Sequence, residues 1–78
     1  HYGIIKQITF FPKIVIEIET NLLAVNLGDS INCSGICLTV SKFHFKDNKT
    51  FFCANISRET ISKTTIVFWN VGQIINIE

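Results

Sequence analysis

Cys37 and Thr39 combine chemically useful side chains with a spacing that would bring them together. One residue separates them, and alternate residues of a β-strand point to the same face. A thiol and a hydroxyl would then share one face, while Ile36, Leu38 and Val40 would fill a core on the other. The pair fits either a face that contacts a ligand or an ordinary strand in which Cys packs as a small hydrophobe.

Glu59 and Thr60 form a second candidate, because Ser57 just before them is a favoured helix N-cap. Free backbone N–H groups at a helix start can meet the polar edge of a ligand, although plain capping accounts for the same residues. His44 lies between two phenylalanines. We interpret it as a surface or half-buried side chain rather than a metal ligand or a base.

Other patterns typical of catalysis or metal binding are lacking. The chain has no Ser/His/Asp order and no Gly-rich phosphate loop. Cys33, Cys37 and Cys53 lack C-x-x-C spacing, so neither a zinc site nor a disulfide framework is predicted. We therefore expect reduced thiols in a cytoplasmic protein.

The charge and hydropathy of the chain exclude further classes. Seven basic and six acidic residues are scattered along it and give a net charge of +1, so a nucleic-acid partner is not expected. No apolar run approaches the roughly 20 residues that span a bilayer, and no membrane partner is expected. The start lacks the features of a signal peptide. Because the chain contains no Met, we expect it to be part of a longer protein.

The 78 residues suffice for one small domain. β-Branched and aromatic residues predict strands at 3–11, 13–19, 30–33, 36–45, 50–56 and 71–78, with one or two helical turns within 57–65. Alternation within 13–19 places Ile14, Ile16 and Ile18 on a core face. The expected fold is all-β: a small six-stranded antiparallel barrel with one short helix, whose closure removes exposed strand edges.

Three stretches of the chain resemble riboflavin synthase. The central one, LGDSINCSGICLTV at 27–40, is similar to a Gly-x-Ser turn followed by Asn-Gly-x-Cys-Leu-Thr-Val. The opening Gly3-Ile4-Ile5 and the segment ANISRETISKTTI at 54–66 match in the same order, and the ending VGQIINIE also fits. The Cys of the Cys-Leu-Thr motif is typical of the amino-terminal lumazine-binding domain of the alpha chain.

This resemblance implies a Greek-key barrel over residues 1–78 that binds 6,7-dimethyl-8-ribityllumazine. In the family, two such molecules are dismutated to riboflavin and a pyrimidinedione without a metal or cofactor. The site lies between the amino-terminal barrel of one subunit and the second, carboxy-terminal barrel of a neighbour in a homotrimer.

The matching positions imply a set of substrate-binding residues. We expect the matched segments to converge on one shallow site outside the barrel core, with the following members: Gly3, Ile4, Ile5, Ser30, Cys37, Leu38, Thr39, Asn55, Ile56, Ser57, Arg58, Glu59 and Thr60. No catalytic residue is assigned. Cys37 and Ser30 are the candidates, and we favour a lining role for Cys37 because no neighbouring His or Lys in the sequence would activate it.

The chain departs from the family pattern at three places. His1-Tyr2 replaces Phe-Thr, Ser34 replaces Asn, and the span from Gly3 to Gly28 is shorter than is usual in the family. An alternative function is therefore a non-catalytic lumazine- or flavin-binding protein of the lumazine-protein type. A nucleic-acid-binding barrel would need basic strands with exposed aromatic residues, and the near-neutral charge argues against it.

Overall fold

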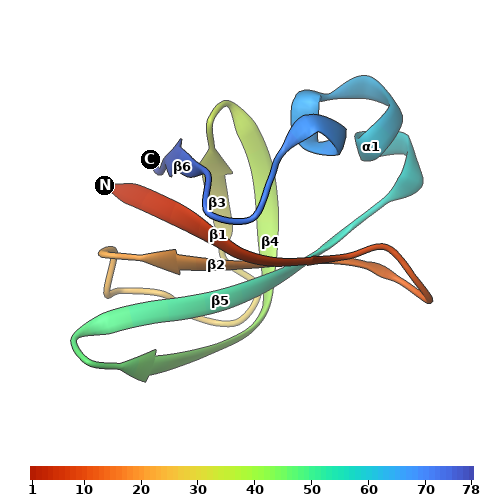
Figure 1. The fold of residues 1–78 in the computed structure, drawn as a ribbon. Coiled ribbons are helices and arrows are strands. Elements are labelled where there is room, and N and C mark those ends of the chain that lie inside the picture. The colour runs from red at the N-terminus through yellow and green to blue at the C-terminus, as the bar shows by residue number, and fades with distance from the viewer.

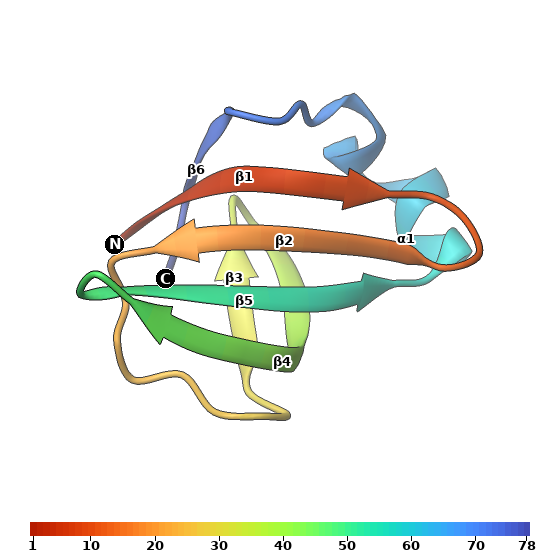
Figure 2. The same ribbon diagram turned by 60° about the horizontal axis from the view of Figure 1, so that its bottom comes forward.

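The computed structural model describes all residues from 1 to 78 as a curled antiparallel sheet with a short helical segment (Figures 1 and 2). The elements in chain order are β1 (Tyr2–Thr9), β2 (Ile14–Thr20), β3 (Ser30–Cys33), β4 (Ile36–Lys46), β5 (Lys49–Ile56), α1 (Arg58–Lys63), η1 (Thr65–Phe68) and β6 (Ile74–Asn76). No helix has the length and apolar character needed to cross a membrane. The all-β class with six strands and one short α-helix is confirmed.

The sheet order is β3-β4-β5-β2-β1-β6, and all neighbouring strands pair antiparallel. β3, β4 and β5 are consecutive neighbours in the sheet, and β5 returns to lie beside β2, which precedes β3 in the chain. This is a Greek-key arrangement. The two ends of the sheet meet through a bridge between Cys33 and Ile77. Ser34, in the turn between β3 and β4, adds a backbone hydrogen bond from its N–H to the Asn76 carbonyl at 2.7 Å.

Ser34 also holds this closure with its side chain, because its hydroxyl accepts a hydrogen bond from the Asn76 N–H at 3.0 Å. Its φ of 51° and the following φ of 88° at Gly35 match a tight hairpin turn. The residue that differs from the family's Asn thus still supports the turn and ties β3 to the last strand.

The predicted alternation of β2 and β4 is confirmed. Ile14, Ile16 and Ile18 are buried, as are Leu38 and Val40, and all five belong to one core cluster of 16 residues. The core also takes in Ile66 and Trp69 from the segment after α1. A 3-10 turn at 65–68, which was not predicted, therefore covers part of the barrel interior.

Strand ends differ from prediction where turns intervene. β1 ends at Thr9 rather than residue 11, because Phe10 to Lys13 form the turn into β2, and β6 is only three residues long. The helix begins as predicted, with Ser57 as its N-cap: the Ser57 hydroxyl accepts a hydrogen bond from the Thr60 N–H at 3.1 Å.

Candidate functional site

Cys37 and Thr39 lie exposed on the outer face of β4, while Leu38 between them is buried. Thr39 pairs with Ser30 of β3, and directly paired residues place their side chains on the same face. The structure therefore gathers Ser30, Cys37 and Thr39 on one exposed surface, as the alternation predicted. Leu38 offers a ligand only its backbone.

The segment from Asn55 to Thr60 approaches this surface from β5. Val40 pairs with Ala54. Because the two strands are antiparallel, the adjacent residues Thr39 and Asn55 lie near each other at this end of the pairing. Asn55 is exposed, whereas the Ile56 side chain is buried in the core. Two of the three predicted segments are therefore neighbours.

Within this segment several polar groups already have partners. The Ser57 hydroxyl lies 2.9 Å from the Thr60 hydroxyl in addition to its capping contact. The Glu59 carboxylate accepts a hydrogen bond from the Lys63 ammonium at 3.0 Å, four residues along the helix. Arg58 takes part in no ion pair, so its guanidinium is the free charge of the segment.

The third predicted segment lies elsewhere. β1 and β4 are three strands apart in either direction around the closed sheet, so Gly3-Ile4-Ile5 and Cys37-Leu38-Thr39 occupy opposite sides of the barrel. The Greek-key order separates strands that local sequence patterns cannot place relative to one another. That the matched segments converge on one ligand site stays a prediction.

Gly3 and Ile5 pack against the core, and the backbone of Ile5 is hydrogen-bonded to the segment before β6. Ile5 is fully buried; its N–H donates to the Gln73 carbonyl at 3.0 Å, and its carbonyl accepts from the Gly72 N–H at 2.7 Å. A Cβ at Gly3 would lie 2.8 Å from Cγ2 of Ile18. Ile4, which is half-buried, has the most accessible side chain of the three.

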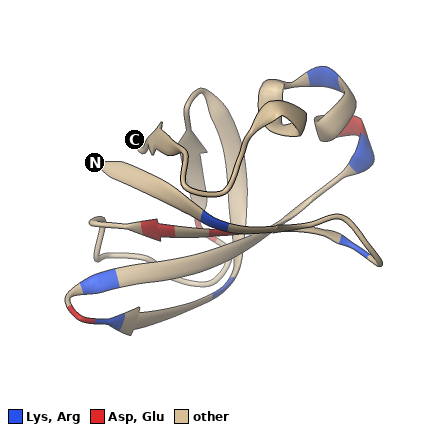
Figure 3. Ribbon diagram, in the orientation of Figure 1, with Lys and Arg blue, Asp and Glu red and all other residues tan.

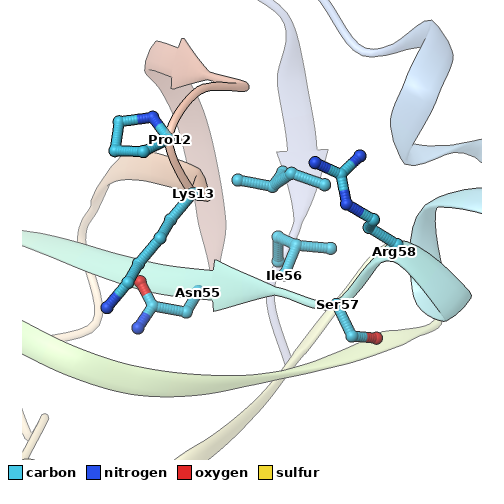
Figure 4. A pocket seen from close by; sticks show the side chains of 7 residues that line it. Pro12, Lys13, Asn55, Ile56, Ser57 and Arg58 are labelled. Carbon is cyan, nitrogen blue, oxygen red and sulfur yellow. The ribbon is translucent and has the colours of Figure 1, made fainter.

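An open cavity of about 390 Å³ lies beside the Asn55–Arg58 segment (Figure 4). Its walls come from two places in the chain: Asn55, Ile56, Ser57 and Arg58 on one side, and Pro12, Lys13 and Ile14 on the other. Sequence reasoning missed the second group. The cross-strand pairing of Ile14 with Ile56 brings the turn after β1 to the end of β5, and no short stretch of sequence signals this pairing.

A second, smaller hollow of about 280 Å³ lies on the outer face of the sheet. It is lined by Gln7, Thr9, Val15, Glu17, Lys42 and Cys53. Burial raises the pKa of the Cys53 thiol, Glu17 adds to that rise and Lys42 opposes it. The neutral thiol is thus favoured, which makes Cys53 a poor nucleophile.

The three cysteines are free thiols in different surroundings. Cys37 is exposed, whereas Cys33 and Cys53 are buried. Burial, with a smaller contribution from Cys37, raises the pKa of Cys33 to about 12. No group of three or more His, Cys, Asp or Glu side chains is arranged to hold a metal ion. The site thus offers hydroxyl, thiol, amide and guanidinium groups around an exposed strand, a set suited to binding a polar heterocycle.

Comparison with known proteins gives one consistent family. The family model described as "Lumazine binding domain" matches residues 2–78. Riboflavin synthase from Buchnera aphidicola is 45% identical over 65 residues, covering 80% of this chain and 29% of the relative. The enzyme from Photobacterium leiognathi is 39% identical over 86 residues, covering 97% and 38%. The Chlamydia muridarum enzyme is 36% identical over 78 residues, covering 100% and 34%.

The chain thus spans only about a third of the length of these relatives. The alignment with the P. leiognathi enzyme is longer than the 78 residues of this chain, so that relative carries residues that the chain lacks. No solved structure matches the chain.

Proposed function

The chain belongs to the lumazine-binding domain family, and we propose that it is the amino-terminal barrel of a riboflavin synthase. The single observation that carries this proposal is the exposed surface where Cys37 and Thr39 lie next to the segment from Asn55 to Thr60. Both parts match the family in sequence, and the family model covers the chain nearly end to end.

In the proposed complex this surface holds one molecule of 6,7-dimethyl-8-ribityllumazine. The alternating donors and acceptors of its ring would meet backbone groups beside Cys37 and Thr39 and around Asn55, while hydroxyls would serve its ribityl chain. Cys37 would line this pocket rather than attack the ligand. Its cross-strand partner is Asn32, which is not a base, and no His or Lys lies beside it in the sequence.

The proposed reaction needs two lumazines, one giving a four-carbon unit to the other to form riboflavin and a pyrimidinedione. One surface of one barrel holds one molecule, so the second would come from another barrel. The position of Gly3-Ile4-Ile5 on the far side of the barrel supports this arrangement, because it separates that segment from the ligand proposed beside Cys37 and Thr39. We therefore propose a shared site in a cytoplasmic homotrimer of two-barrel chains.

Ligand binding can be tested by titrating riboflavin into the chain and following flavin fluorescence. Thr39→Ala and Thr60→Ala should each weaken binding by about 0.5–3 kcal/mol, the range for losing one polar contact to a buried partner. Thr65→Ala is a matched control, because Thr65 is exposed and lies outside the matched positions that contact the ligand. Unchanged affinity in both test variants, with far-UV circular dichroism intact, would count against the proposed surface.

A further inference from the structure

The cavity of about 390 Å³ contains two positive charges and no negative one. Lys13 and Arg58 both line it, and its other lining residues are Pro12, Ile14, Asn55, Ile56 and Ser57. Neither cation takes part in any of the three ion pairs of the structure. Figure 3 shows basic segments at the tip of the β1–β2 hairpin and at the start of α1, on the same side of the molecule. Positive charge without a counter-ion in a hollow surface attracts anions.

The cavity also has an apolar floor. Ile14 and Ile56 are cross-strand partners, and each is 7% exposed. In Figure 4 the Lys13 and Asn55 side chains lie toward one end of the cavity and the Arg58 guanidinium toward the other, with Ile56 between them. Both cationic side chains are long and exposed, so an anion above this floor can be approached from two sides. Arginine presents a planar fork and lysine a point charge, and both are common phosphate ligands.

The cavity is continuous with the surface assigned to the ligand ring. Asn55 and Ser57 line the cavity and also belong to the segment from Asn55 to Thr60 that the family match assigns to the ligand. A chain that leaves the ring over this segment therefore enters the cavity directly. The segment adds an amide and a hydroxyl but no carboxylate inside the cavity.

We propose that the cavity binds the terminal phosphate of a phosphorylated flavin or lumazine side chain between Lys13 and Arg58. This inference rests on the proposed function, since it extends the same ring site by one anionic subsite. A phosphate monoester carries a charge of about −1.5 to −2 at neutral pH, which matches two unpaired cations. The chain would then bind flavin mononucleotide more tightly than riboflavin.

The test compares both flavins on the wild-type chain and on Lys13→Gln and Arg58→Gln variants. Two exposed charge contacts should make flavin mononucleotide bind about 3- to 30-fold more tightly than riboflavin at low salt, and about 0.5 M salt should remove most of this preference. Each variant should lose most of the preference, measured as the ratio of the two dissociation constants. Lys13→Gln, which lies outside the matched positions, should change the affinity for riboflavin less than about twofold. Inorganic phosphate should compete with flavin mononucleotide and not with riboflavin.

Lys46→Gln is the matched control. It makes the same change in net charge at an exposed lysine that takes part in no ion pair and lies at the other end of β5, in the β4–β5 turn region. It should keep the full preference. Equal affinity for both flavins in the wild type, or an equal loss in Lys46→Gln, overturns the phosphate subsite while leaving riboflavin binding intact. Failure of both flavins to bind overturns the proposed function together with this inference.

Discussion

At Gly3 the structure has no room for a methyl group. A Cβ there would lie 2.8 Å from Cγ2 of Ile18 and 3.1 Å from Cδ1 of Ile77. The opening glycine of the family motif therefore has a packing role, since it lets β1 pass close to the core.

We predict that Gly3→Ala lowers the free energy of unfolding by about 1–3 kcal/mol, the usual cost of overpacking. Ile18→Leu removes the crowded methyl group, so the double variant should recover part of this loss in urea denaturation. Wild-type stability in Gly3→Ala, or strictly additive effects of the two changes, would contradict the packing role.

The Cys33 thiol links stability to alkaline pH. Its pKa rises from 9.0 to about 12, chiefly because folding buries it. The folded state therefore keeps the proton where the unfolded state loses it. The stabilisation is present below pH 9 and is lost as the pH rises toward 12.

We predict that the free energy of unfolding falls between about pH 9 and pH 12, and that Cys33→Ala makes this decline shallower. Cys37→Ala is the control, because Cys37 is exposed and should leave most of the decline in place. Urea denaturation at a series of pH values measures the slope. Equal slopes in wild type and Cys33→Ala would argue against the buried-thiol origin.

At the scale of elements, α1 depends on its cap. Its six residues include no buried side chain, so packing contributes little and the Ser57 hydroxyl carries much of its stability. The Ile61 N–H donates to the Ser57 carbonyl at 3.1 Å, which makes the exchange of this amide a local measure of the first turn.

We predict that Ser57→Ala speeds hydrogen exchange of the Ile61 amide about fivefold, because an N-cap contributes about 1 kcal/mol. Ser57→Asp should keep the wild-type rate, since aspartate is an equally good cap. An unchanged rate in Ser57→Ala, measured by NMR, would mean that the cap does not hold this turn.

At the scale of the whole molecule, one barrel supplies one ligand surface and a two-substrate reaction needs two. Holding both reactants in place contributes up to roughly 7–11 kcal/mol in well-ordered cases. We predict that the chain of residues 1–78 binds riboflavin but converts lumazine slowly in steady-state assays. Full-rate turnover by this chain alone would refute the shared site.

A second assay at this scale concerns Cys37. In a full two-barrel chain, Cys37→Ser should retain substantial turnover, because the cross-strand partner of Cys37 is Asn32, which is not a base, and a lining role tolerates a hydroxyl. Complete loss of turnover with ligand binding intact would show that Cys37 acts as a nucleophile.

Local chemistry was sufficient to predict much of this protein from its sequence. Alternation with a period of two residues predicted the buried faces of β2 and β4, and Ser57 predicted the start of the helix. Both signals depend on only a few neighbouring residues. The motif around Cys37 indicated the family, which the comparisons show. The exposed positions of Cys37 and Thr39 followed from the same alternation.

Only the tertiary structure decided which segments meet. The Greek-key order places Gly3-Ile4-Ile5 on the side of the barrel opposite Cys37, and the pairing of Ile14 with Ile56 brings Lys13 to Arg58. The closure of the barrel through the hydrogen bond between Asn76 and Ser34 could not be predicted from the sequence either. These contacts join residues far apart in the chain, and their register follows from how all six strands bury their apolar faces together, which no short stretch of sequence specifies.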